Sequence, residues 1–319
     1  MMKISEKLFG FHKGRDVFVF SVENESGYRV ELLSYGAGLC GLYFPSNPAQ
    51  NCVLGFDSFA DYESNNYYLG STVGPTAGRI KNAQYKIDDI TYNLDKNEGE
   101  NNLHGGGRAF HNIVWNAKKH ARGVKFTSSE IMAAEVIYSL NKNNSLEIIF
   151  RAKSKKPALF NPANHTYFNL GDLDIKNHYL QINAREYLEL DKQNIPTGKK
   201  LPVKNTVYDF TESSPIGNHL KGKGIDTPFF LENHVACVLE NKERTRRISV
   251  ITDRNALVVY TAGYFEPVWK INGRVAAQFM GIALEAQTLP DAVNHPGWGD
   301  IVIKNDSIKE YKTVLMLEN

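Results

Sequence analysis

The chain has 319 residues, of which 42% are hydrophobic and 23% charged, a composition that excludes a mostly disordered protein. Its 37 basic and 35 acidic residues give a formal net charge of +2 at pH 7, so the overall charge does not favour a nucleic acid or another phosphate-rich partner. The N-terminal segment lacks the apolar run of a signal peptide, and no apolar stretch approaches the ~18 residues of a membrane-spanning helix. We therefore expect a cytoplasmic protein without a membrane or nucleic-acid partner.

Short β-strands dominate the predicted elements. The runs Val17–Val22 and Tyr28–Tyr35 are rich in β-branched and aromatic residues and flank the polar segment 23–27, a pattern typical of a hairpin. Further runs of this kind follow at 146–152, 179–182, 187–190, 248–252, 257–261 and 313–317. Sixteen Tyr and 17 Phe against 5 Met strengthen the preference for strands.

Helical periodicity is scarce. Short helices are predicted only at Ser58–Glu63 and around Val275–Phe279. The chain shows no βαβ alternation, no internal repeat and no linker-like segment. Many short strands separated by Gly, Asn, Asp or Pro therefore predict an all-β fold, a single large antiparallel β-sandwich with a few short helices, formed by residues 1–319 as one domain.

Cysteines and basic residues give little functional signal. Cys40, Cys52 and Cys237 are far apart and have neither the CxxC spacing of a zinc site nor the density of a disulfide scaffold, so we expect free thiols. The one dense basic stretch, 242–247 (KERTRR), also contains an acidic residue and is interpreted as a solvated turn.

Polar clusters remain after the common catalytic motifs are excluded. The sequence has no Walker loop, no GxGxxG after a strand, no GxSxG, no HExxH and no HxH pair, so neither a metal nor a nucleotide cofactor is indicated. Four polar clusters fall in segments rich in Gly, Asn or Pro, where loops are expected to leave strands: 74–82, 101–107, 161–171 and 281–296. Each contains one side chain suited to acid–base or hydroxyl-binding chemistry: Arg79, His104, His165 and Glu285, respectively.

Each of these side chains also has a purely structural interpretation. A lone His in a Gly-rich loop is more often structural than catalytic, and Arg79 is compatible with a surface charge. The segment Asn164–Thr166 is compatible with a turn whose side chains bond the backbone. Glu285 is harder to explain, because a buried carboxylate in the apolar run GIALEA needs a partner or a functional role.

Taken together, the clusters resemble the aldose 1-epimerase (galactose mutarotase) family. The resemblance covers nearly the whole chain, and its markers occur in the family's order: GFDSFADY (55–62), GRI (78–80), NNLHGG (101–106), NHTYFNL (164–170), PTG and LPV (196–203), YDF (208–210), GID (224–226) and EAQTLPDAVNHP (285–296). It implies a single large antiparallel β-sandwich that interconverts the α and β anomers of a free aldohexose such as galactose or glucose. It further implies an enzyme without cofactor or metal, as a monomer or homodimer.

The resemblance also implies roles for individual residues. Glu285 would be the base, His165 the acid, and His104 a second imidazole near the ring oxygen. Five residues would contact the sugar: Arg79, Asp226, Gln287, Asn102 and Tyr167. Two departures from the family pattern affect substrate preference more than chemistry: Thr227 stands where many relatives have His, and GPTA precedes Arg79 where a further Arg is frequent.

Aromatic residues near the clusters are candidate platforms for the apolar face of a sugar, although each is more often part of a core. They are Tyr167, Phe168, Phe229 and Trp298.

These residue types suit mutarotation. Ring opening removes a proton from the C1 hydroxyl and delivers one to the ring oxygen. A glutamate with a reference pKa of about 4.3 is ionised at neutral pH and is expected to begin as the acceptor, whereas an imidazole with a pKa of about 6.5 suits the donor.

Two alternatives remain open. A hexose-6-phosphate epimerase needs several cations around the phosphate, and Lys81 and Arg108 lie near Arg79 in the sequence. A non-catalytic sugar-binding module needs hydroxyl contacts but no proton relay.

Overall fold

Alternating side chains explain why so much of this chain forms strands. In β13 (Ser145–Lys153), Leu146, Ile148, Phe150 and Ala152 are buried, while the residues between them are partly exposed. The structure, a computed structural model, describes residues 2–64 and 66–319. About 48% of the residues are in strands and 6% in helices, so the predicted all-β class is confirmed.

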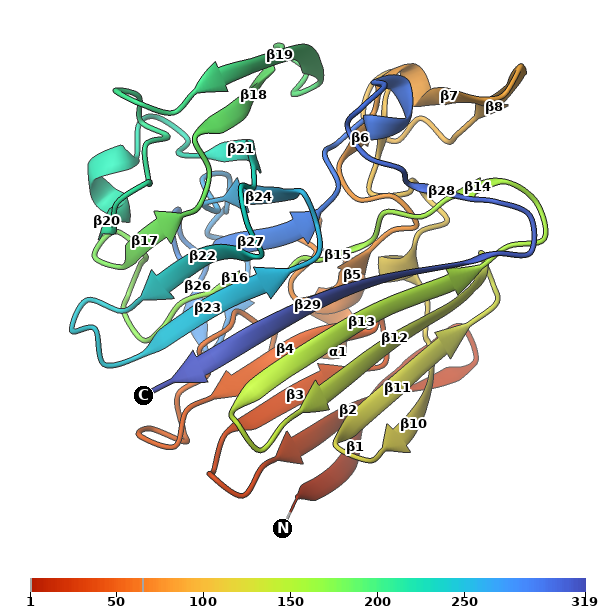
Figure 1. The fold of residues 1–319 in the computed structure, drawn as a ribbon. Coiled ribbons are helices and arrows are strands. Elements are labelled where there is room, and N and C mark those ends of the chain that lie inside the picture. Colours follow the sequence, from red (N-terminus) through yellow and green to blue (C-terminus); the bar gives the residue numbers. More distant parts are fainter. Residues whose placement is uncertain (1, 65) are drawn as a thin grey trace.

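The largest sheet has nine antiparallel strands in the order β10-β11-β12-β13-β29-β23-β22-β17-β20. Besides β13, its strands are β10 (Asn116–His120), β11 (Gly123–Ser128), β12 (Ala133–Leu140), β29 (Ile308–Glu318), β23 (Arg247–Thr252), β22 (Val235–Glu240), β17 (Tyr179–Ile182) and β20 (Ser214–Pro215). The last strand of the chain, β29, lies between β13 and β23 and joins segments far apart in sequence (Figure 1).

Two smaller antiparallel sheets complete the main architecture. A six-stranded sheet consists, in spatial order, of β16 (Tyr167–Phe168), β27 (Ile282–Gln287), β24 (Ala256–Tyr260), β21 (Asp226–Phe230), β18 (Glu186–Leu190) and β19 (Pro196–Pro202). A four-stranded sheet consists of β1 (Lys3–His12), β2 (Arg15–Glu23), β3 (Arg29–Leu33) and β4 (Gly38–Tyr43). One hydrophobic core includes Leu32, Phe150 and Ile282, so it joins the inner faces of all three sheets as in a β-sandwich.

Short elements cover the ends of these sheets. The helical segments are α1 (Phe59–Ser64) and the 3₁₀ turns η1 (Lys81–Ala83), η2 (Phe110–Asn112), η3 (Ile216–His219) and η4 (Ala292–Asn294). The two-stranded pairs are β5 (Thr72–Val73) with β15 (Ala163–Asn164), β6 (Arg79–Ile80) with β9 (Asn102–Leu103), β7 (Gln84–Ile87) with β8 (Ile90–Asn93), β14 (Ala158–Leu159) with β28 (Val302–Ile303), and β25 (Lys270–Ile271) with β26 (Arg274–Val275).

The predicted elements agree with the structure, with one exception. Every predicted strand coincides with or overlaps an observed one, β2 and β3 form the expected hairpin, and α1 corresponds to the helix predicted at Ser58–Glu63. The helix predicted around Val275–Phe279 is wrong. Val275 instead ends the β25–β26 hairpin, whose turn residues Asn272 and Gly273 have φ of 50° and 71°. Asn-Gly favours this left-handed turn geometry, which no helix accommodates.

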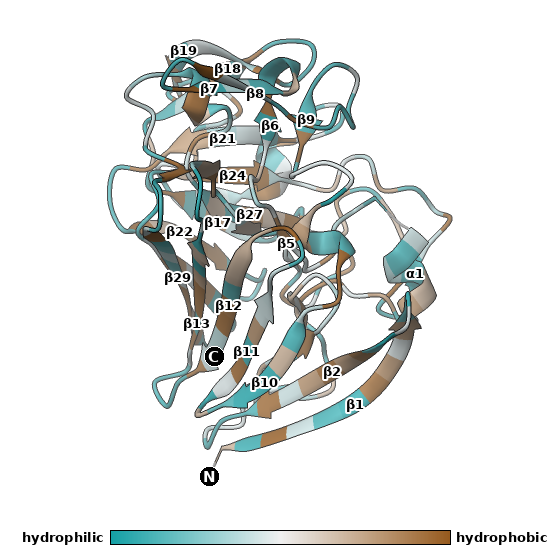
Figure 2. Ribbon diagram, turned by 90° about the vertical axis from the view of Figure 1, so that its right-hand side faces the viewer, coloured by the Kyte–Doolittle hydropathy of each residue, from teal (hydrophilic) through white to brown (hydrophobic). Residues whose placement is uncertain are grey.

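Other sequence-based expectations concern the surface and the thiols. The three cysteines are free, and the basic stretch 242–247 contains a turn between β22 and β23, as predicted. Within the described residues, no helix has the length and apolar character needed to cross a bilayer. Figure 2 shows hydrophobic colour mainly along the strands and hydrophilic colour mainly in the connecting loops.

Candidate active site

Strand β27 carries the buried carboxylate on the face opposite the main core. All six of its residues are buried, and Ile282 and Leu284 belong to the core shared by the sheets. Because successive side chains of a strand point to opposite faces, Glu285 and Gln287 point together to the other side. Glu285 therefore lies within a strand of the six-stranded sheet and not in a loop, which corrects the sequence-based expectation.

The neighbouring strands contribute the residues around Glu285. Val258 of β24 is the cross-strand partner of Glu285, and Tyr260, two residues further, lies on the same face. Asp226 at the start of β21 pairs with Tyr260. The same alternation turns Phe229 to the opposite face and into the main core. Antiparallel register thus gathers alternate residues of three strands onto one surface.

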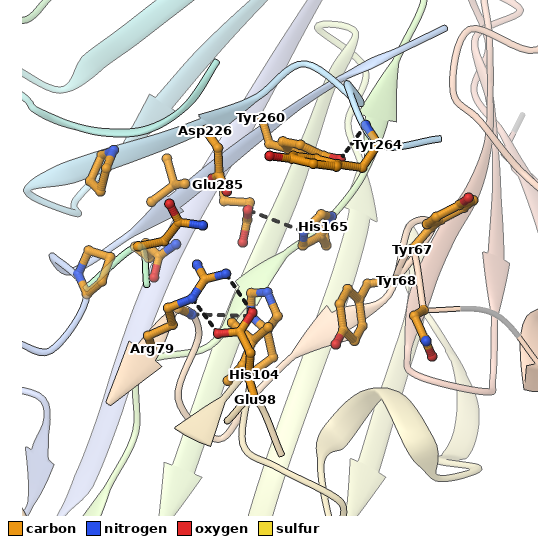
Figure 3. Close-up of a pocket in the computed structure, with 18 of the residues that line it drawn as sticks. Tyr67, Tyr68, Arg79, Glu98, His104, His165, Asp226, Tyr260, Tyr264 and Glu285 are labelled. Carbon is orange, nitrogen blue, oxygen red and sulfur yellow. Dashed lines mark hydrogen bonds and ion pairs between the residues drawn. The ribbon is translucent and has the colours of Figure 1, made fainter. Parts of the chain in front are cut away.

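This surface forms the floor of a cavity of about 370 Å³. Such a volume is in the usual range for small-molecule sites. Its lining includes the side chains labelled in Figure 3, namely Tyr67, Tyr68, Arg79, Glu98, His104, His165, Asp226, Tyr260, Tyr264 and Glu285. Further lining residues are Tyr167, Leu190, Asn194, Pro228, Val258, Gln287 and Pro290. The cavity therefore brings together seven of the eight predicted site residues.

His165 lies directly opposite the carboxyl group. It is held between β15 and β16, where its N–H donates to the carbonyl of Ser71 (2.8 Å) and its carbonyl accepts from Gly70 (3.1 Å). The Nε2 atom of His165 is 3.4 Å from Oε1 of Glu285, and both side chains are at most 5% exposed. A carboxyl group and an imidazole thus meet at the cavity floor.

His104 approaches the same point from the loop after β9. It has a left-handed backbone (φ 52°), and a Cβ on the following Gly105 would come within 2.3 Å of the carbonyl oxygen of Gly74. The N–H of Gly78 donates to Nδ1 of His104 (3.2 Å). Because Nδ1 accepts this bond, the ring proton resides on Nε2, which makes His104 a hydrogen-bond donor at that atom.

Burial controls the protonation of the facing groups. It raises the pKa of Glu285 to about 8; the nearby Asp226 adds to this effect and Arg79 opposes it. Burial also lowers the pKa of His165 to about 3. The pKa of His104 lies well below its ordinary value because of burial and of the neighbouring His165.

The expectation that Glu285 is ionised at neutral pH is therefore wrong for the free site. Between about pH 3 and pH 8, Glu285 and His165 together hold one shared proton, which burial places on the carboxyl group. Transfer of that proton from Glu285 to His165 gives the carboxylate and imidazolium without changing the number of bound protons.

Arg79 is held by a partner that the sequence did not reveal. Its Nε donates to Oε2 of Glu98 (2.6 Å) and its Nη2 to Oε1 (2.8 Å), a bidentate pair visible in Figure 3. Burial lowers the pKa of Arg79, but the bonds to Glu98 and the charge of Asp226 outweigh it, so the net pKa is raised. The guanidinium is therefore firmly charged.

Several buried polar atoms of the cavity-lining residues have no hydrogen-bond partner among the described residues. They are Oε2 of Glu285, Nδ1 of His165 and both amide atoms of Gln287. Buried polar groups are normally paired in folded proteins, so their grouping in one cavity indicates a polar ligand.

Some predicted residues lie elsewhere. Asn102 is not among the cavity-lining residues, and its Nδ2 donates to the carbonyl of Asp95 (2.8 Å). Of the four candidate aromatic platforms, only Tyr167 lines the cavity; Phe168 and Phe229 belong to the main core and Trp298 to a smaller one. Thr227, where the sequence departs from the family pattern, is buried and does not line the cavity.

Other cavity residues were missed by sequence reasoning. They include Glu98 and the tyrosines Tyr68, Tyr260 and Tyr264. The ring of Tyr68 packs edge-on against His104, with centroids 4.8 Å apart, and lies 5.6 Å from that of His165. No local motif marks these residues, because they reach the cavity from three separate segments.

The imidazoles and the carboxyl group also resemble a metal-binding donor set. One ligand atom from each of His104, His165 and Glu285 lies within 4.8 Å of the others. Ligation through Nε2 of His104, however, requires a free lone pair there. The Gly78 N–H stabilises the tautomer that has a proton on Nε2, so the arrangement suits proton transfer better than metal binding.

The structure is that of an all-β protein with a buried carboxyl group and two imidazoles at a polar cavity, and comparison with known proteins identifies the family. The sequence model of the aldose 1-epimerase family matches residues 19–316. An aldose 1-epimerase from Streptococcus thermophilus is 36% identical, with 98% of this chain and 97% of the relative covered. A maltose epimerase from Levilactobacillus brevis is 31% identical, with 95% of each chain covered.

Solved structures agree. A crystal structure of galactose 1-epimerase from Lactobacillus acidophilus superimposes with a TM-score of 0.90 at 29% identity, covering 100% of this chain and 99% of the other. The chain belongs to the aldose 1-epimerase family, and it is an enzyme of the isomerase class.

Proposed function

We propose that this enzyme interconverts the α and β anomers of a free aldohexose, galactose or glucose, acting as a single domain in the cytoplasm. The observation that carries the proposal is the 3.4 Å approach of Nε2 of His165 to Oε1 of Glu285 at the floor of a cavity lined by polar groups and tyrosines. The reaction needs only two coordinated proton transfers, which this pair is suited to supply.

Ring opening proceeds from the carboxylate–imidazolium form of the pair. Glu285 accepts the proton of the C1 hydroxyl, the bond between C1 and the ring oxygen breaks with its electrons on that oxygen, and His165 donates a proton to it. Rotation about the C1–C2 bond then presents the other face of the aldehyde. Both transfers reverse as the ring closes.

His104 has a separate role. Its Nε2–H is available to donate a hydrogen bond to the ring oxygen, where negative charge develops during opening. A fixed donor in a buried site stabilises such charge without reorganisation. His104 therefore lowers the barrier without itself changing protonation state.

Substrate binding is assigned to the remaining polar groups of the cavity. Arg79, Asp226 and Gln287 offer donors and acceptors for sugar hydroxyls, and Gln287 has both amide atoms free for that purpose. Tyr167 packs against His165, with ring centroids 5.0 Å apart, and supports that imidazole. We assign Asn102 to supporting the loop of His104 instead of contacting the sugar, because its amide is bonded to Asp95.

The test is polarimetry with freshly dissolved α-glucose and α-galactose, with maltose included because one relative is named for it. Acceleration of anomer exchange by purified protein supports the proposal. Tight sugar binding without acceleration would contradict it and favour a binding module. Turnover of glucose 6-phosphate but not of glucose would favour the phosphate-specific alternative, although neither Lys81 nor Arg108 lines the cavity.

A further inference from the structure

Arg79 is the one guanidinium or ammonium group among the described residues that line the cavity. Three carboxyl groups share the lining with it, those of Glu98, Asp226 and Glu285. Glu98 pairs with Arg79 through two hydrogen bonds of 2.6 and 2.8 Å, so the positive charge of Arg79 is already matched within the protein. The charge balance of the cavity is thus unfavourable for an anion.

The segment carrying Glu98 is built onto the strand pair that carries Arg79. Arg79 of β6 lies opposite Leu103 of β9. The side chain of Asn97 accepts from the N–H of Leu103 (2.8 Å) and donates to its carbonyl (3.0 Å), while Glu98 forms a bridge with Asn101. These bonds fix the backbone at Glu98 relative to that at Arg79. The backbone therefore holds the two side chains of the ion pair close together.

Bidentate pairing also sets the orientation of the guanidinium. Glu98 occupies Nε and Nη2, and no partner of Nη1 is found in the described part of the chain. A planar guanidinium held at two nitrogens has little rotational freedom. Nη1 is consequently the atom presented to a sugar hydroxyl.

We propose that Glu98 is a positioning and specificity-determining residue that orients and neutralises Arg79, so that the cavity selects neutral aldoses and rejects sugars bearing a phosphate or a carboxylate. This inference rests on the proposed function, since it assigns the substrate class of the same site. An anionic sugar must either approach the carboxyl groups of Glu98 and Asp226 with no unpaired cation or compete with Glu98 for Arg79. A neutral hydroxyl requires only the free N–H.

The test compares Glu98→Gln with Glu100→Gln as a matched control. Glu100 lies two residues away, pairs with Lys96 in an exposed position and does not line the cavity, so both variants lose one negative charge from the same loop. For each protein, kcat and KM are measured with glucose, glucuronate and glucose 6-phosphate by polarimetry or NMR exchange. Thermal unfolding verifies that both variants are folded.

In Glu98→Gln, the ratio of kcat/KM for either anionic sugar to that for glucose should rise roughly tenfold or more, because an unpaired cation then faces the anion in a partly buried site. The KM for glucose should rise a few-fold with kcat nearly unchanged. The substitution removes the orientation of Arg79 but leaves the acid–base pair Glu285 and His165 in place. A purely structural role would not change the ratio. Glu100→Gln should behave as the wild type.

Equal ratios in the two variants would overturn the assignment of Glu98, as would a wild-type enzyme that uses glucuronate as readily as glucose. Failure of the proposed function is distinguishable, because wild-type protein would then accelerate the exchange of no free aldose. Even in that case, calorimetric binding of glucose and glucuronate to wild type and Glu98→Gln decides whether Glu98 excludes anions.

Discussion

Replacement of Glu285 by Gln should stabilise the protein, and increasingly so as the pH rises. Burial raises the pKa of this carboxyl from 4.5 to about 8, so the native state binds its proton more tightly than the unfolded chain does. Wild-type stability attributable to this group is thus fully present below about pH 4.5 and is lost as the pH rises toward 8. A glutamine has nearly the same shape and does not titrate.

The expected magnitude follows from these two pKa values. Each pH unit between them corresponds to about 1.4 kcal/mol, and integration over the titration predicts that the wild type loses roughly 4 kcal/mol relative to Glu285→Gln between pH 5 and pH 9. At about 2 °C per kcal/mol for a chain of this size, the difference in melting temperature should widen by roughly 8 °C.

Denaturant unfolding monitored by tryptophan fluorescence, repeated from pH 5 to pH 9, measures the effect directly. Glu100→Gln supplies the control for removal of an exposed carboxylate. Wild-type and Glu285→Gln stability curves that run parallel over this range would refute the reasoning. They would show that the buried carboxyl titrates near its ordinary pKa in the folded protein.

The remaining predictions concern activity. Glu285→Gln and His165→Asn should each reduce mutarotation measured by polarimetry by roughly 10³-fold with the fold retained, and near-normal turnover would remove that residue from the mechanism. His104→Gln should cost less, roughly 10²-fold, because it removes a hydrogen-bond donor and not a proton-transfer group; a wild-type rate would make His104 scaffolding. Arg79→Ala should chiefly raise KM, because its proposed contact is the same in ground state and transition state, whereas a selective loss of kcat would contradict that assignment. For the wild type, kcat/KM should be flat between about pH 3 and pH 8 and fall above pH 8 as Glu285 and His165 lose their shared proton; a rise through pH 8 would instead show that the carboxylate acts with a neutral imidazole.

The strands were predictable because the sequence pattern that indicates a strand lies within the strand itself. Burial on one face of a sheet requires apolar residues at every second position, as in β13, and such runs can be found without knowing their partners. The wrong prediction of a helix at Val275–Phe279 has a local cause as well: the preceding Asn272 and Gly273 form a hairpin turn, and Asn-Gly is a sequence signal for such a turn.

Seven of the eight predicted site residues line one cavity, in agreement with the family resemblance from which they were predicted. The exception is informative. Asn102 stands next to cavity residues in the chain, but as a strand residue its side chain points away from that of Leu103, which lines the cavity. Proximity in sequence therefore does not place a side chain in a site.

By itself, the sequence determined the strand-rich class, the family resemblance and the unusual position of one carboxylate in an apolar run. Those properties depend on residue type and spacing along the chain. Only the tertiary structure decided that Nε2 of His165 faces Glu285 at 3.4 Å, that Gly78 keeps the proton of His104 on Nε2, and that Glu98 engages Arg79. These contacts join residues that are far apart in sequence, so they exist only once distant segments pack together. The burial that results raises the pKa of Glu285 above the ordinary value of a glutamate.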